Sequence, residues 1–164
     1  MTQRKKVVVM GGGNGTAKVL RALKVYPEYE ISAVVSVSDS GGSSGRLRKE
    51  FGVLPPGDIL RAVLALSRHD YEDLKQIFYS TRFQNAGALS DHNLGNLFLV
   101  LAEQYGNDFV SAIRALEQAL EAQGHVYPAT LESVHLNAEL SNGEVIRTEA
   151  DIDRPTYSRS LKIQ

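Results

Sequence analysis

The 164-residue chain contains no cysteine and no tryptophan. Without cysteine it can form neither a disulfide nor a thiolate-ligated metal site, and thiol catalysis is excluded. An excess of charge of one sign is also missing, because 18 Lys and Arg residues stand against 19 Asp and Glu residues. We therefore expect no nucleic-acid partner and no attachment to an anionic membrane surface.

Long hydrophobic runs are absent as well. The apolar run "VVVM" at 7–10 is too short for the core of a signal peptide, and no segment is long enough to span a membrane. The cytoplasm is therefore the expected location. The composition, 43% hydrophobic and 23% charged, is typical of a globular protein, and the length suffices for one domain with a hydrophobic core.

The first forty residues predict a β-strand, a helix and a second β-strand. The β-branched run at 5–10 is bounded by glycine, which is typical of a short buried strand. Apolar positions within 15–25 share one helical face, and 31–38 is apolar enough for a strand buried on both faces. The short connections favour a parallel pair with a right-handed crossover. We therefore expect an α/β fold with a Rossmann-like parallel sheet and flanking helices.

The rest of the chain predicts more helices and then a hairpin. The helices are expected at 55–69, 93–104 and 108–123. Asp58 or Gly57 is the expected N-cap of the first of them, and Gly124 is expected to end the last as its C′ residue. Apolar and polar residues alternate on both sides of Asn142-Gly143, which predicts a C-terminal antiparallel β-hairpin.

Four glycines in five residues follow the first strand. A loop that leaves the carboxyl end of a parallel strand and opens a helix presents free N–H groups and the positive end of the helix dipole to an anion. The candidate phosphate-binding residues here are Gly11, Gly12, Gly13, Asn14, Gly15 and Thr16. The dinucleotide fingerprint is only half met, because Thr16 takes the place of the third glycine, and no Walker sequence follows. Tight packing of strand against helix is the alternative explanation.

A second glycine-rich stretch, "DSGGSSGRLR" at 39–48, follows the second strand. Backbone N–H groups, hydroxyls and a guanidinium can together surround a phosphate. The candidate ligand-binding residues are Asp39, Gly42, Ser43, Ser44, Gly45 and Arg46. A carboxylate repels phosphate, so Asp39 is assigned to a ribose hydroxyl or to a metal ion such as Mg²⁺. A flexible Ser/Gly linker with a solvated arginine is the alternative.

Two predicted helix starts carry further polar candidates. Asp58 follows a Pro-Pro pair, and His92, Asn93 and Asn96 begin the helix predicted at 93–104. His92 and Asn96 are four residues apart and so share a helical face. Each residue is a candidate for ligand contact, although helix capping alone would explain the same positions. No Ser/His/Asp or paired-carboxylate arrangement can be identified from the sequence.

Five stretches together resemble one family. They are "VVVMGGGNG", "VVSVSDSGGSSGRLR", "FGVLPPGDI", "HNLGNL" and "HLNAELSNGEVIRTE". They occur in the order seen in the YvcK-like proteins, or gluconeogenesis factors, of the CofD-like superfamily, and the resemblance covers about 6–152. It implies a Rossmann-type, 2-phospho-L-lactate transferase-like fold with its site at the strand ends.

The resemblance implies different functions in the two branches of that superfamily. The YvcK branch is cytoplasmic, is tied to growth on gluconeogenic carbon sources and to cell shape, and binds nucleotide sugars of the UDP-N-acetylglucosamine kind. The CofD branch is a Mg-dependent transferase that moves a phospholactyl-type group onto a deazaflavin alcohol. "GVLPPGDI" with "GGSSGRLR" looks like the YvcK branch.

The chain departs from the family pattern at several positions. Asn14 replaces a threonine, Ser40 replaces a second acid and thereby removes one possible metal ligand, and Leu60-Arg61 stands where Arg-Asn is usual. Family members are also about twice as long. We therefore expect 1–164 to be a single domain that forms the N-terminal part of a longer family fold.

These observations predict a non-catalytic factor that binds a UDP-sugar or related nucleotide. The phospholactyl-type transferase is the alternative, and an NAD-binding oxidoreductase, suggested by the strand–helix–strand unit alone, is a weaker one. A sheet with strands apolar on both faces leaves one face or edge uncovered in a chain of this length. A homo-oligomer is therefore expected.

Overall fold

A three-stranded parallel sheet organises the computed structural model, which describes residues 4–106, 108–153 and 163. The strands are β1 (Lys5–Gly11), β2 (Tyr29–Val35) and β3 (Gly124–Pro128), in the order β1-β2-β3. Val7 lies opposite Ile31, and Ile31 lies opposite Gly124. The predicted parallel pairing of the first two strands is confirmed.

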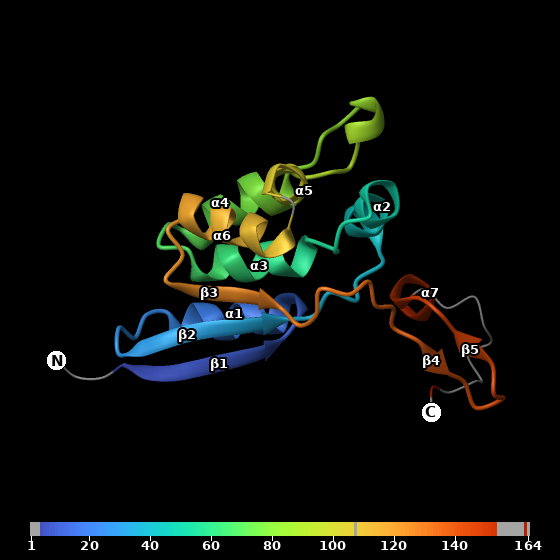
Figure 1. The fold of residues 1–164 in the computed structure, drawn as a ribbon, viewed down its shortest axis with the longest axis horizontal. Helices are drawn as coiled ribbons and strands as arrows, with labels where there is room; N and C mark the ends of the chain where they lie inside the picture. The colour runs from blue at the N-terminus through green and yellow to red at the C-terminus, as the bar shows by residue number, and fades with distance from the viewer. Residues whose placement is uncertain (1–3, 107, 154–162, 164) are drawn as a thin grey trace.

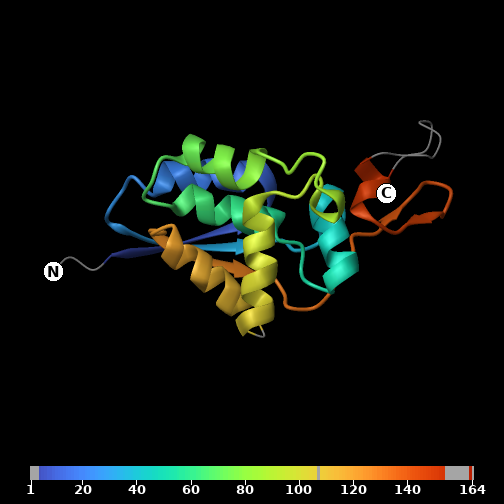
Figure 2. The same cartoon turned by 90° about the horizontal axis from the view of Figure 1, so that it is seen from above.

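Three helices cover one face of this sheet: α1 (Gly13–Leu23), α3 (Gly57–Leu66) and α6 (Phe109–Ala119). Figure 1 shows α3 and α6 above the strands and α1 behind them, and Figure 2 shows the same helices from above. Their apolar stripes form the main core with the inward residues of β2 and β3. Its fully buried side chains include Leu20, Ile59, Leu64, Leu66, Ile113 and Leu116. The core therefore holds the carboxyl ends of the strands in a fixed position relative to the helix starts.

Further helices lie beyond the strands or on the outer side of α3 and α6. They are α2 (Gly42–Phe51), α4 (Tyr71–Leu74), the π-helix η1 (Lys75–Ser80), the 3₁₀ turn η2 (Gly87–Leu89) and α5 (Leu94–Gly106). Figure 1 shows α2 past the arrowheads of the strands. α5 packs against α6 and also touches α2. In the described part of the chain, no helix has both the length and the apolar character needed to cross a membrane.

The predicted C-terminal hairpin is confirmed. β4 (Ala138–Glu139) pairs antiparallel with β5 (Val145–Ile146), and Gly143 has a φ of 83° in the turn. A short helix, α7 (Glu149–Asp153), follows. Figure 1 shows this unit at the carboxyl end of the sheet, on the same side as α2.

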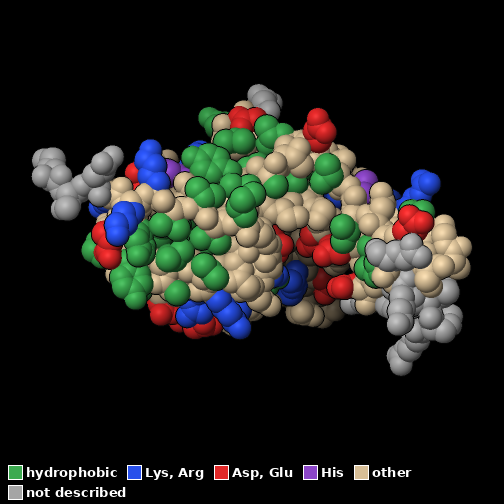
Figure 3. Space-filling view, turned by 90° about the horizontal axis from the view of Figure 1, so that it is seen from below, with side chains coloured by type: hydrophobic (Ala, Val, Ile, Leu, Met, Phe, Trp, Pro, Cys, Tyr) green, Lys and Arg blue, Asp and Glu red, His purple; other side chains and the backbone are tan. Residues whose placement is uncertain are grey.

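The sheet is buried on one face only, as expected for a chain of this length, but the strand predicted at 31–38 is not buried on both of its faces. Ile31, Ala33 and Val35 are buried in β2, but in the edge strand β1 Val8 is 60% exposed and Met10 is 76% exposed. Figure 3 shows hydrophobic side chains gathered over the sheet on this open side. The reason is that the helices packed on the sheet, α1, α3 and α6, cover its opposite face.

Two helix boundaries also differ from the prediction. The N-cap of α3 is Pro56, so Gly57 and Asp58 lie inside its first turn. Helix α6 ends at Ala119, and Gly124 begins β3 instead of ending the helix. A Cβ at Gly124 would lie 2.6 Å from the carbonyl oxygen of Ile31. The glycine is therefore explained by the close approach of two strands.

Candidate functional site

The two glycine-rich stretches converge on the start of α3, at the carboxyl ends of β1 and β2. A Cβ built at Gly12 would lie 2.7 Å from Asp58 Oδ2. A Cβ built at Gly57 would lie 2.8 Å from Ser44 Oγ and 3.7 Å from Asp39 Oδ2. Figure 3 shows a hollow near the middle of the molecule, lined by acidic and basic side chains. Ligands of parallel α/β sheets bind at this end of the strands.

The side chain of Asp58, which belongs to α3, caps the first turn of α1. Its Oδ2 accepts a hydrogen bond from the backbone N–H of Gly13 at 2.8 Å. Arg61 forms an ion pair with this carboxylate, with Nη1 3.4 Å from Asp58 Oδ1. The guanidinium of Arg61 also donates a hydrogen bond to the hydroxyl of Tyr79 and lies over the Tyr79 ring. A carboxylate therefore sits at the helix terminus where the sequence predicts a phosphate.

The rest of the first glycine loop is held by its own contacts. The hydroxyl of Thr16 donates to the carbonyl of Gly12 at 3.1 Å and is buried. A Cβ at Gly11 would lie 2.6 Å from that hydroxyl oxygen. Asn14 and Gly15 lie exposed on the first turn of α1. Of the six candidates in this loop, these two are the ones that face solvent without a role in holding the turn.

The second stretch is not a linker, because helix α2 begins at Gly42, with a φ of 51°. Ser43, Ser44 and Gly45 therefore lie in the first turn of a helix. Ahead of it, Asp39 Oδ1 accepts the N–H of Gly41 at 2.8 Å. The first backbone N–H groups of a helix have no partner within the helix, so this turn can present donors to an anion.

A buried polar cluster joins α2 to the start of α5. Ser43 Oγ and His92 Nδ1 are hydrogen-bonded at 2.7 Å, and Asn96 Nδ2 donates to Ser43 Oγ at 3.3 Å. Asn93 Oδ1 accepts the N–H of Asn96 at 2.8 Å and so caps the helix start. His92 and Asn96 are each 2% exposed. Burial, followed by the charge of Arg46, lowers the pKa of His92, so the imidazole is neutral at physiological pH.

A second acidic residue joins Asp39 from the far end of the chain. Glu149, the first residue of α7, accepts the N–H of Ser40 at 3.1 Å. Burial raises the pKa of Glu149, and its hydrogen bond with Asp39 raises it further. Among the described residues, no three His, Asp or Glu side chains cluster closely enough to hold a metal ion. No local pattern could have indicated this pair, because 109 residues separate Glu149 from Ser40.

A cavity of about 530 Å³ lies beside the first turn of α2. Two guanidiniums line it. Arg46 donates to the carbonyl of Ser90 at 2.6 Å, and Arg82 donates to the carbonyl of Asp91 at 2.9 Å. Gly42, Ser43 and Asp91 complete the lining. Sequence reasoning missed Arg82, because 81–93 is irregular apart from one turn of 3₁₀ helix and has no periodicity that marks it.

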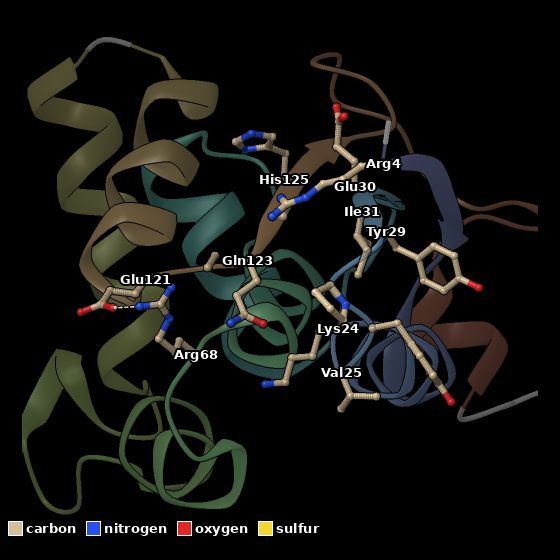
Figure 4. A pocket seen from close by; sticks show the side chains of 14 residues that line it. Arg4, Lys24, Val25, Tyr29, Glu30, Ile31, Arg68, Glu121, Gln123 and His125 are labelled. Atoms are coloured by element: carbon tan, nitrogen blue, oxygen red, sulfur yellow. Dashed lines mark ion pairs between the residues drawn. The ribbon is translucent and has the colours of Figure 1, made fainter. Parts of the chain in front are cut away.

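Another cavity, of about 840 Å³, lies at the opposite end of the sheet. Figure 4 shows side chains from the starts of β2 and β3 around it, together with Lys24, Arg68 and Glu121. Arg68 and Glu121 form an exposed ion pair at 3.6 Å. No residue predicted from the sequence to bind a ligand lies there. The carboxyl end of the sheet, where all of those residues gather around α1, α2, α3 and α5, is therefore the candidate site.

Comparison with known proteins gives consistent matches. Residues 7–164 match the family described as 2-phospho-L-lactate transferase CofD. The gluconeogenesis factors of Halalkalibacterium halodurans and Bacillus subtilis are each 41% identical to the chain, over 98% and 99% of its length. A putative gluconeogenesis factor of Nostoc sp. is 46% identical over 91% of the chain.

The solved structures agree with this match. A crystal structure of a UPF0052 family member from Bacillus halodurans superposes with a TM-score of 0.88 at 39% identity and covers all of this chain. The chain spans 48% and 50% of the two gluconeogenesis factors, 32% of the Nostoc relative and 50% of the crystallised protein. A family match over nearly the whole chain and a shared fold lead to one conclusion: the chain belongs to the CofD family.

Proposed function

We propose that this chain carries the nucleotide-sugar-binding part of a gluconeogenesis factor, with a ligand of the UDP-N-acetylglucosamine kind. The observation that carries the proposal is the convergence of both glycine-rich stretches on Gly57 and Asp58 at the carboxyl end of the sheet. The names of the relatives support a role in gluconeogenic carbon metabolism. Control of cell shape, the second role proposed here, follows from the resemblance to the YvcK branch. The cytoplasm is the proposed location.

The ligand's polar groups would have distinct partners in this site. The first turn of α2 and the guanidinium of Arg46 would bind phosphate, because both present N–H donors. Asp39 would accept a ribose hydroxyl. Asn14 would offer its exposed amide from the first turn of α1. Gly13 is a weaker candidate than the sequence predicts, because its N–H is already bonded to Asp58.

A phospholactyl-type transferase is the second candidate, and one observation favours it. Asp39 and Glu149 place two carboxyl groups together at the edge of the site. Mg²⁺ is often held by one or two carboxylates plus substrate phosphates, so these two residues would hold such an ion beside a bound nucleotide. The ion would neutralise part of the negative charge of the phosphates. Binding of a deazaflavin alcohol only in the presence of Mg²⁺ would favour this candidate.

Calorimetric titration of UDP-N-acetylglucosamine tests the first proposal. Replacing Arg46 by Ala removes a charged hydrogen-bond donor, which is worth about 1.5–3 kcal/mol. The expected result is a loss of affinity of about tenfold to hundredfold. Arg68→Ala is the matched control, because its side chain is 69% exposed at the opposite end of the sheet. Ser43 is a poorer target, since its hydroxyl is buried between His92 and Asn96.

Equal affinities of the wild-type protein and the Arg46→Ala variant would remove this arginine from the site. An absence of heat with the wild-type protein would contradict the nucleotide-sugar proposal itself. The unfolding midpoint of each variant, measured in parallel, separates lost binding from lost folding.

A further inference from the structure

We propose that Arg82 is a phosphate-binding residue, and that the ligand's diphosphate lies beside α2, between Arg46 and Arg82, instead of at the start of α1. This inference rests on the proposed function and assigns the position of the ligand within the same site. It adds a residue that the glycine-rich stretches do not contain.

The start of α1 is already filled by protein charge. Asp58 accepts the N–H of Gly13 at 2.8 Å, and Arg61 lies against Asp58 with a side chain only 17% exposed. A phosphate at this terminus would have to displace the carboxylate or lie beside it. Two like charges at such a distance repel each other. The guanidinium of Arg61 lies beside Gly13 but is engaged by Asp58 and Tyr79. The first glycine loop is therefore the weaker phosphate site.

The start of α2 has the opposite arrangement. Two arginines, Arg46 and Arg82, line the cavity beside it. Arg46 donates a hydrogen bond to the backbone carbonyl of Ser90, and Arg82 donates one to the neighbouring carbonyl of Asp91. Each of these contacts uses one nitrogen, and a guanidinium carries five N–H donors. Two arginines that converge on neighbouring carbonyls can therefore both turn donors toward one anion.

The other groups at this cavity define the class of ligand. Burial, together with the charges of Arg46 and Arg82, lowers the pKa of His92 behind the cavity, so the imidazole adds no positive charge. Asp91 also lines the cavity, and its carboxylate would accept hydroxyl groups. Two cations with one carboxylate suit a diphosphate that is attached to a hydroxylated sugar better than they suit a bare polyanion.

Titration calorimetry on the full chain tests the inference with two probes, UDP-N-acetylglucosamine and inorganic pyrophosphate. Arg82→Ala is expected to weaken the nucleotide sugar about tenfold to hundredfold, the loss typical of one charged hydrogen bond, and to weaken pyrophosphate in the same direction. Arg61→Ala, at the start of α1, and Arg68→Ala, at the far end of the sheet, are expected to change either affinity by less than about threefold, since neither removes a donor from this cavity. Arg82→Gln, which keeps the length of the side chain and removes its charge, serves if Arg82→Ala does not fold.

The outcomes separate this inference from the proposed function. If the wild-type protein binds UDP-N-acetylglucosamine and Arg82→Ala binds it equally well, the inference is overturned and the proposed function stands. The inference is likewise overturned if Arg61→Ala is the variant that loses binding. If pyrophosphate binds through Arg82 but the nucleotide sugar does not bind, the phosphate site stands and the proposed ligand is overturned. Binding of neither probe to the wild-type protein overturns both.

Discussion

At the scale of single residues, Gly45 determines how the second glycine-rich stretch folds back. A Cβ at this position would lie 2.1 Å from the carbonyl oxygen of Ser40 and 2.7 Å from its carbonyl carbon. Both atoms belong to backbone, so no rotamer change can relieve the contact. The N–H of Gly45 also closes the first turn of α2 onto the carbonyl of Gly41 at 3.0 Å. Because Gly45 has no side chain, Asp39 and the first turn of α2 can lie close together.

Gly45→Ala is expected to lower the free energy of unfolding by about 1–3 kcal/mol or more, the cost of an overpacked contact. Gly15→Ala is the matched control, because nothing lies within 4 Å of its Cβ and its φ is not positive. In a helix that change is expected to raise stability by about 0.5–1 kcal/mol. Urea unfolding of the two variants measures the difference. Two variants of equal stability would show that the Ser40 backbone can move aside at little cost.

At the scale of secondary-structure elements, α1 is capped by a residue of another helix. Its own N-cap, Gly12, has no side chain to accept a hydrogen bond, and Asp58 of α3 takes that role across 45 residues of sequence. Helix α6 has the usual local arrangement, in which Asp108 accepts the N–H of Ser111 at 2.7 Å. The capping of α1 therefore also fixes α3 against the first glycine loop.

Asp58→Ala is expected to lower the free energy of unfolding by about 1–3 kcal/mol, because it leaves the N–H of Gly13 unpaired and Arg61 without its carboxylate. Asp108→Ala removes an exposed local cap and is expected to cost about 1 kcal/mol. Thermal or urea unfolding compares the two. Asp58→Asn, which keeps an acceptor oxygen, should fall between wild type and Asp58→Ala. A cost at Asp58 no greater than that at Asp108 would refute the bridging role.

At the scale of the whole molecule, the sheet presents one apolar face to solvent. Met10, Val34 and Tyr127 lie in register across the three strands, and Val8 lies two residues before Met10 on the same face. Met10 is 76% exposed and Tyr127 is 38% exposed. Exposed apolar patches of this kind usually mark a contact with another polypeptide surface. A second copy of the chain can supply that surface.

We predict that the chain self-associates through this face, and that Met10→Lys shifts the equilibrium toward monomer by placing a charge on it. Tyr105→Lys is the control, because Tyr105 is 93% exposed on α5, away from the sheet. Sedimentation equilibrium or light scattering at several concentrations measures the effect. A wild-type protein that is a monodisperse monomer at high concentration would argue against the prediction.

Local sequence patterns determined most of the framework. The β-branched runs of the first two strands, the apolar stripe of α1 and the Asn142-Gly143 turn each act over a few residues, so their periodicity and turn chemistry suffice to predict them. The first glycine-rich stretch could be assigned to a helix start for the same reason. The prediction for Gly124 was wrong because glycine is common both at the end of a helix and where two strands approach closely. Only the position of the partner strand distinguishes these two roles.

The site itself depended on the tertiary structure. The phosphate-binding residues that the sequence predicts are two glycine-rich stretches, two serines and an arginine. Only the fold decided that Asp58 fills the first helix start, that Glu149 reaches Asp39, and that Arg82 joins Arg46 at one cavity. The partners in these contacts are separated by tens of residues or more along the chain. No local propensity encodes such distances, because the packing of α2, α3 and α5 around the strand ends brings these side chains together.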